Sequence, residues 1–167
     1  MTRRKIGNPE PGAVRRLVDR ADIHDLLSRY ARACDTKDWS LYRALFTPDA
    51  VIDYTAAHGI RGSLAEVSEW IARVVVPSSV PKTQHLVTNV EIAVEGPDQA
   101  TAHAYFINPN VQRDTTGKES LLLNGGYYTA TVRRTTQGWR IARLVDELTF
   151  SHRGELEQFQ LPSLEGQ

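Results

Sequence analysis

The chain lacks the features that mark several large classes of protein. It has a single cysteine, Cys34, so no disulfide can form within the chain, and we expect a reducing compartment such as the cytoplasm. No stretch approaches the ~20 consecutive apolar residues of a transmembrane helix. The basic N-terminal segment is not followed by an apolar run, which is unlike a secretory signal.

Neither sign of charge is in excess, because 20 Lys and Arg residues balance 20 Asp and Glu residues. Without a net basic field, nucleic acid and acidic membranes are poor candidates for a partner. The HExxH, CxxC, P-loop and GxGxxG motifs are also missing, so no motif indicates a metal or a nucleotide.

The first half of the chain has helical periodicity. The first predicted helix starts near Val14 and carries one apolar stripe that ends at Cys34. Asp38 is the expected N-cap of a short second helix whose apolar side extends to Phe46, and residues 47–50 are expected to form a turn. A short strand over 50–54 follows. A capping box from Ser63 to Glu66 then opens a third helix.

After residue 81 the apolar period changes to two, which predicts a four-stranded meander. Three helices, a short strand and four long strands predict an α+β fold with helices on one face of a curved antiparallel sheet. Helices over such a sheet form a cone that encloses one pocket. We expect a loose arm over 1–12, one domain over 13–152 and a polar tail over 153–167.

Several motifs resemble those of a known family. They are "YARACDTKDW", "LFTPDAVIDY", "TQHLVTN", "GGYY" and "GWRIARL". Together with the order of elements, they make residues 14–152 similar to the SnoaL-like group of the NTF2-like superfamily. Within that group, "KDW", "IDY" and "TQH" resemble scytalone dehydratase and the bile-acid 7-alpha-dehydratases. The resemblance implies a cone-shaped α+β fold and catalysis without a cofactor.

The resemblance also implies roles for particular residues. His85 matches the general base or acid, Asp35 the carboxylate that orients it, and Tyr54 and Tyr30 the hydroxyls that polarise a substrate carbonyl. Each has an ordinary structural reading as well: a satisfied histidine, a turn residue and two core aromatics. His85 has the opposite strand parity to the apolar residues after it, so it reaches the core face only through a bulge or before regular pairing begins.

The sequence departs from the family pattern at its second acid. Asn110 stands where scytalone dehydratase has a second histidine, and Asn108 lies near the aspartate of the bile-acid enzymes. An amide can hold a substrate oxygen but cannot shuttle a proton. On the later strand, the serine and the asparagine of scytalone dehydratase are replaced by Gly126 and Tyr128. We expect the remaining substrate contacts to come from Asn110, Asn108, Tyr128, Trp39 and Phe106.

The expected function is dehydration or isomerisation of a cyclic, partly apolar hydroxy-carbonyl compound of polyketide or steroid type. Alternatives are a polyketide cyclase with the same residues, a binding module without chemistry, and a small subunit that braces a larger oxygenase. The paired His85 and Asp35 argue against the last. We also expect a homodimer through the outer sheet face, near His103, Tyr105 and the arginines of the last strands, Arg133, Arg134, Arg140 and Arg143.

Overall fold

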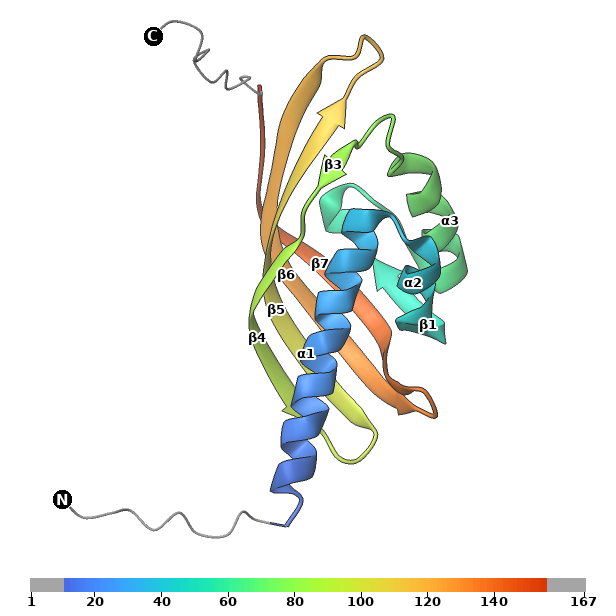
Figure 1. The fold of residues 1–167 in the computed structure, drawn as a ribbon, viewed down its shortest axis with the longest axis vertical. Coiled ribbons are helices and arrows are strands. Elements are labelled where there is room, and N and C mark those ends of the chain that lie inside the picture. Colours follow the sequence, from blue (N-terminus) through green and yellow to red (C-terminus); the bar gives the residue numbers. More distant parts are fainter. Residues whose placement is uncertain (1–10, 156–167) are drawn as a thin grey trace, which may run out of the picture.

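The computed structural model describes residues 11–155, which form a mixed α+β fold of three α-helices on a curved, open sheet (Figure 1). The helices are α1 (Ala13–Thr36), α2 (Trp39–Ala44) and α3 (Leu64–Val74), with a short 3-10 helix η1 (Thr55–Ala57). The strands are β1 (Phe46–Asp53), β2 (Arg61–Ser63), β3 (Lys82–Thr83), β4 (Leu86–Val94), β5 (Gln99–Arg113), β6 (Glu119–Thr135) and β7 (Gly138–Glu155).

The helix starts agree with the sequence signals. Asp38 caps α2 by accepting a hydrogen bond from the backbone N–H of Leu41 at 2.8 Å. Ser63 and Glu66 form the predicted capping box at the start of α3. α1 ends where Lys37 adopts a left-handed conformation with φ 56°.

Three strand predictions were wrong in detail. Residues 47–50, expected to form a turn, belong to β1, which begins at Phe46 and has an irregular register before Val51. The short strands β2 and β3 were not predicted at all. β7 continues to Glu155, into the segment assigned to the polar tail. The rest of the predicted arm and tail lies outside the described residues.

The sheet has the order β2-β1-β7-β6-β5-β3, with β4 also paired to β5. β1 runs parallel to β7, whereas the long strands β4 to β7 form antiparallel pairs in chain order. Helix α1 crosses the concave side of these long strands, and α2 and α3 lie to one side of it (Figure 1). The inward side chains at several positions of β5 and β6 are small and buried, which lets neighbouring elements pack close to the sheet. They are Ala100, Ala102, Ala104 and Ala130.

Two glycines shape the bend of the long strands. A Cβ added to Gly126 would lie 1.9 Å from the backbone oxygen of Glu147, and one added to Gly125 would lie 2.3 Å from the ring of Phe150. The register between β6 and β7 shifts at this point, and it shifts again between Thr131 and Val132. The two glycines of "NGGYY" therefore serve close strand approach in a bent sheet.

The arginines of the last strands do not form one solvated row. Arg134 donates to the buried carboxylate of Asp19 at 2.7 Å, and its guanidinium lies 4.3 Å from the ring centroid of Trp139. Arg133 pairs with Asp49. The expectation of a solvated or dimer-facing surface is therefore wrong for Arg134, which anchors the start of α1 to the hairpin between β6 and β7.

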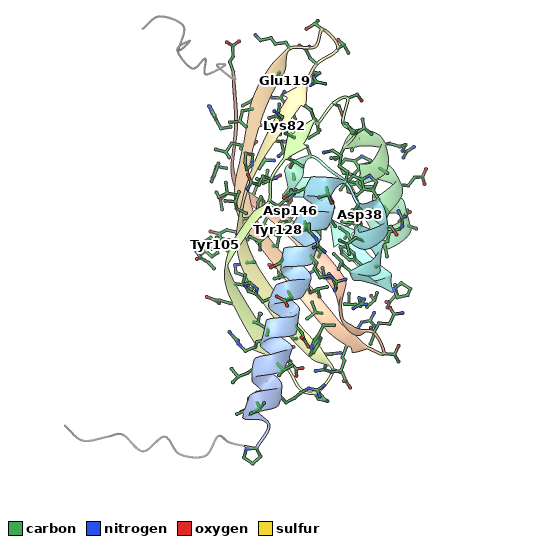
Figure 2. All side chains as sticks on the ribbon, viewed as in Figure 1. Asp38, Lys82, Tyr105, Glu119, Tyr128 and Asp146 are labelled. Carbon is green, nitrogen blue, oxygen red and sulfur yellow. The ribbon has the colours of Figure 1, made fainter. Side chains whose placement is uncertain are left out.

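The outer face of the sheet carries aromatic side chains. Tyr105 is 43% exposed, and Figure 2 shows it projecting away from the helices, whereas Tyr128 and Asp146 lie on the helix side. The rings of His103 and Tyr127 stack with centroids 5.3 Å apart, next to Tyr105. None of the helices between residues 11 and 155 has the length and apolar character needed to cross a bilayer.

Candidate active site

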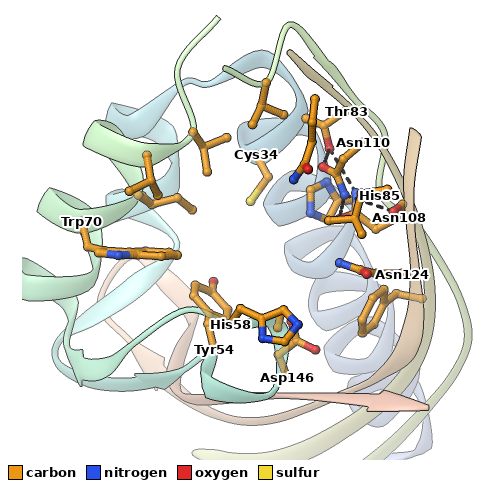
Figure 3. A pocket seen from close by; sticks show the side chains of 18 of the residues that line it. Cys34, Tyr54, His58, Trp70, Thr83, His85, Asn108, Asn110, Asn124 and Asp146 are labelled. Carbon is orange, nitrogen blue, oxygen red and sulfur yellow. Dashed lines mark hydrogen bonds between the residues drawn. The ribbon is translucent and has the colours of Figure 1, made fainter. Parts of the chain in front are cut away.

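A cavity of about 500 Å³ opens between the helices and the concave face of the sheet (Figure 3). This volume is in the range of small-molecule sites. Eight of the nine predicted site residues line it: Tyr30, Trp39, Tyr54, His85, Phe106, Asn108, Asn110 and Tyr128. The ninth, Asp35, lies behind His85. A second recess of about 370 Å³ shares Val74, Val80, Gln112 and Arg153 with this cavity.

His85 and Asp35, 50 residues apart in sequence, are in direct contact. The carboxylate accepts the backbone N–H of His85 at 3.0 and 3.1 Å and faces ring atom Nδ1 at 2.6 Å. Because an ionised carboxylate can only accept, Nδ1 carries the proton of the neutral ring. Nε2 is then bare and is the nitrogen that can take a proton from a ligand in the cavity.

A bulge in β4 turns His85 inward. Asn89 has φ 50°, and the pairing of β4 with β5 shifts register between Thr88 and Glu91. Before the bulge, His85 and Val87 are partly buried; after it, the inward positions change parity, and Ile92 is buried. Both arrangements that the sequence allowed for His85 are present, because the strand has a bulge and His85 precedes the regular pairing, which begins at Leu86.

Three tyrosine hydroxyls form a chain that leads from the buried core to the cavity wall. Tyr42 and Tyr54 are 2.9 Å apart at their oxygens, and Tyr54 and Tyr30 are 2.7 Å apart. Three hydroxyls have three protons, and the two links of the chain use two of them. Tyr42 is fully buried away from the cavity, so its hydroxyl donates to the hydroxyl of Tyr54. One proton of Tyr54 or Tyr30 is then left for a ligand.

Burial keeps these hydroxyls protonated. Desolvation, followed by the neighbouring tyrosines and Cys34, raises the pKa of Tyr30 and of Tyr54 well above the usual value. Burial likewise raises the pKa of the Cys34 thiol to about 12. The tyrosines therefore remain hydrogen-bond donors at neutral pH, and Cys34 is not an activated nucleophile.

The two predicted amide ligands are already engaged within the protein. Asn108 donates to the Thr83 hydroxyl and to the Gln84 carbonyl oxygen, both at 3.0 Å. Asn110 accepts from Thr83 at 2.7 Å and donates to the Asn108 side chain at 2.8 Å. Because Gln84 precedes His85, this network holds the strand segment that carries the imidazole.

The other predicted contacts lie around the same cavity. Phe106 stacks on Tyr128 with centroids 4.3 Å apart, and Tyr30 meets Tyr128 edge-on at 5.5 Å. Trp39, at the start of α2, lines the cavity. An amide from β6 is also present: Asn124 points into the cavity and accepts from Ser151 at 2.8 Å (Figure 3). The resemblance to the family had placed Gly126 and Tyr128 at the positions of its serine and asparagine, and it had not pointed to Asn124.

The most consequential residue that the sequence reasoning missed is Asp146 on β7. It lines the cavity and is buried, and its Oδ1 has no hydrogen-bond partner among the described residues. A signal was available, because Asp146 alternates with Leu144 and Leu148 on the inward face of the strand. A carboxylate at a period-two apolar position is unusual enough to mark a site.

Other residues of the cavity were also missed or set aside. Trp70 and Ile71 contribute from α3, His58 from the loop after η1, and Arg153 from the end of β7. His58 adopts a left-handed conformation with φ 62°. Within residues 11–155, no cluster of three or more His, Cys, Asp or Glu side chains is placed to hold a metal ion.

Comparison with known proteins gives a consistent group of relatives. The model of the SnoaL-like domain matches residues 15–145. Rv2910c, an uncharacterized protein of Mycobacterium tuberculosis, is 33% identical over 138 residues, which cover 83% of this chain and 90% of that protein.

Solved structures share the fold. A protein provisionally named as an aromatic ring hydroxylase from Novosphingobium aromaticivorans has a TM-score of 0.73 and 28% identity, covering 82% of this chain and 94% of that one. A hexachlorocyclohexane dehydrochlorinase, LinA type 2, has a TM-score of 0.72 and 18% identity, covering 90% of this chain and 99% of that one. At 18% identity, the second likeness concerns the fold alone.

Proposed function

The chain belongs to the SnoaL-like domain family, as its motifs predicted, and we propose that it is a cofactor-free acid–base enzyme that removes water from a cyclic hydroxy-carbonyl compound. One observation carries the proposal: the Asp35 carboxylate fixes Nδ1 of His85 at 2.6 Å and leaves Nε2 as a base at the cavity. Family membership alone does not select this activity, because one fold serves many chemistries.

The proposed reaction begins with proton abstraction beside a carbonyl group. Nε2 of His85 takes the proton from the carbon, and Asp35 stabilises the imidazolium that forms. The carbonyl oxygen becomes an enolate oxygen and receives the spare hydroxyl proton of the Tyr54–Tyr30 pair as a hydrogen bond. The hydroxyl group on the neighbouring carbon then takes up a proton and leaves as water, which yields the unsaturated product.

The walls of the cavity favour a ring system of moderate size. Aromatic and aliphatic side chains supply most of the surface, including Trp39, Trp70 and Phe106. A volume of about 500 Å³ accommodates a fused two-ring compound. We therefore propose cyclic β-hydroxyketones as the substrate class.

The test uses 3-hydroxy-1-tetralone, which forms 1-naphthol when it loses water, so the product is followed by its fluorescence. We expect turnover by the wild type and a loss on the order of 10²–10⁴-fold in His85→Gln. The matched control is His103→Gln, because His103 lies on the outer face of the sheet, and this variant should retain its rate.

Full turnover in His85→Gln would eliminate this mechanism. Binding without turnover, across a panel of cyclic hydroxyketones, would favour a binding module instead. A panel in which open-chain polyketide mimics cyclise while hydroxyketones stay intact would favour the aldol-type cyclase.

A further inference from the structure

Asp146 is a buried carboxyl group with an unsatisfied oxygen at the cavity wall. Its side chain projects inward from β7, the residue is 7% exposed, and Oδ1 has no hydrogen-bond partner among residues 11–155. Figure 3 shows it on the opposite side of the cavity from His85 and the asparagines. Most buried polar side-chain atoms have a hydrogen-bond partner, so an unpaired carboxyl group needs an explanation. Because Asp146 lines the cavity, a ligand that binds its side chain is one such explanation.

The charges around Asp146 disfavour its ionised form. Asp53 at the end of β1 and Glu147, the next residue on β7, are both acidic, and Tyr128 is its cross-strand neighbour on β6. The loop after η1 adds His58 at the same part of the cavity. No lysine or arginine among the described residues forms an ion pair with Asp146. Burial first, and then Asp53 and Glu147, raise the pKa of Asp146 to about 7.

A neutral carboxyl supplies what the asparagines cannot. As the acid, Asp146 has an O–H that can donate to an uncharged oxygen, and it can release that proton. His85 and Asp146 then divide the two proton transfers of a dehydration between a base and an acid on opposite sides of one cavity. The family's second acid, missing at Asn108 and Asn110, would thus come from another strand.

We propose that Asp146 recognises the leaving hydroxyl group of the substrate and protonates it; this role rests on the dehydration proposed above. The C–H bond breaks, its proton goes to Nε2 of His85, and its electron pair forms the new C=C bond. The C–O bond breaks, and the departing oxygen takes the proton of Asp146 and leaves as water. The imidazolium and the carboxylate that remain are reset by transfer of one proton through solvent.

The role of Asp146 narrows the substrate class. The group at this wall must be an uncharged oxygen, since a carboxylate or phosphate there would lie beside the ionised form of Asp146 and in the negative field of Asp53 and Glu147. A hydroxyl is a poor leaving group that needs a proton, whereas acetate leaves without one. The acid should therefore accelerate the reaction of hydroxyl substrates and should have little effect on the reaction of acetoxy substrates.

The first experiment compares two leaving groups. Wild type and Asp146→Asn are assayed with 3-hydroxy-1-tetralone and with 3-acetoxy-1-tetralone. We expect Asp146→Asn to lose on the order of 10²-fold or more with the hydroxyl compound and less than ~10-fold with the acetate. Equal losses with both compounds would overturn the assignment, because a structural defect does not distinguish leaving groups.

The second experiment needs no turnover. The ether 3-methoxy-1-tetralone can only accept a hydrogen bond at its ether oxygen, so it binds to the neutral acid and not to the carboxylate. Its binding to His85→Gln is followed by the fluorescence of the cavity tryptophans, Trp39 and Trp70. We expect affinity to fall by roughly tenfold or more between pH 6 and pH 8.5 as Asp146 ionises, and to stay constant when Asp146→Asn is added.

A third variant keeps the test valid if Asp146→Asn does not fold. Asp53→Asn removes a negative charge that disfavours ionisation of Asp146, so the pH midpoint of ether binding should move down. Affinity that does not change with pH in the Asp53-intact protein would refute the role of Asp146. The two proposals fail separately: pH-dependent binding without turnover removes only the dehydration, and turnover with pH-independent binding removes only the acid.

Discussion

Replacing Asp35 by asparagine should loosen the control of the His85 tautomer. In the wild type, the carboxylate oxygen Oδ1 accepts the backbone N–H of His85 at 3.0 Å and faces Nδ1 at 2.6 Å, and Oδ2 accepts the same backbone N–H at 3.1 Å. The amide of Asp35→Asn can lie in two ways, because its oxygen can take either position. With the oxygen at the Oδ1 position, the tautomer is unchanged. With the NH₂ group there, Nδ1 must give up its proton and Nε2 must carry one, since an NH₂ group only donates, and the nitrogen that faces the cavity is then no longer a base.

The size of the effect follows from these contacts. Part of the protein loses its base and the imidazolium loses a charged partner, so the rate on 3-hydroxy-1-tetralone should fall, but by less than the loss on the order of 10²–10⁴-fold expected for His85→Gln. Stability should change far less, because the backbone hydrogen bond survives and the Asp35 side chain is 24% exposed. Replacing one charge-assisted hydrogen bond by a neutral one should lower the free energy of unfolding by about 1 kcal/mol.

The tautomer is observable without a substrate. Nitrogen-15 NMR of the imidazole should show a protonated Nδ1 in the neutral wild-type ring and a mixture of rings protonated at Nδ1 and at Nε2 in Asp35→Asn. The matched control is Asp38→Asn, since Asp38 caps α2 through Leu41 and does not contact His85. An unchanged tautomer in Asp35→Asn, or an equal change in Asp38→Asn, would refute the positioning role of Asp35.

Three further predictions concern stability and assembly. Arg134→Leu should lower the free energy of unfolding by about 3 kcal/mol in urea denaturation, because it leaves the buried Asp19 carboxylate without its 2.7 Å partner; a loss below ~1 kcal/mol would contradict this. Gly126→Ala should unfold at lower temperature than Gly154→Ala, since the added Cβ would lie 1.9 Å from a backbone oxygen in the first case and 3.5 Å from a side-chain atom in the second. Tyr105→Lys should dissociate the expected homodimer, and light scattering of the wild type that gave 18.7 kDa at micromolar concentration would rule the dimer out.

The local signals in the sequence were reliable where neighbours along the chain determine the structure. The Asp38 cap and the Ser63–Glu66 box both form as expected, because capping is a contact within one turn of a helix. The parity of His85 indicated a bulge or a position before regular pairing, and both are present. The predictions failed at residues 47–50, where a proline in a polar run indicated a turn but pairing with β7 at Phe46 and again from Val51 continues the strand through these residues.

The candidate site divides in the same way. Motif resemblance pointed to His85, Asp35, Tyr54 and Tyr30, because such motifs record residue types at given positions. It did not show that Asn108 and Asn110 hold the strand segment beside His85, or that Tyr42 completes a hydroxyl chain. Those are contacts between side chains from different elements, and no spacing in the sequence encodes them.

By itself, the sequence determined the α+β class, the family and the pairing of an imidazole with a carboxylate 50 residues away. These depend on apolar periodicity and on residue identity, which are properties of the linear chain. The state of Asp146 depended on the folded molecule: its parity along β7 indicates burial, but the orphaned oxygen and the acidic neighbours Asp53 and Glu147 arise only when β1, β6 and β7 lie side by side. Desolvation and charge act through space, so the protonation of this carboxyl is a property of the tertiary structure.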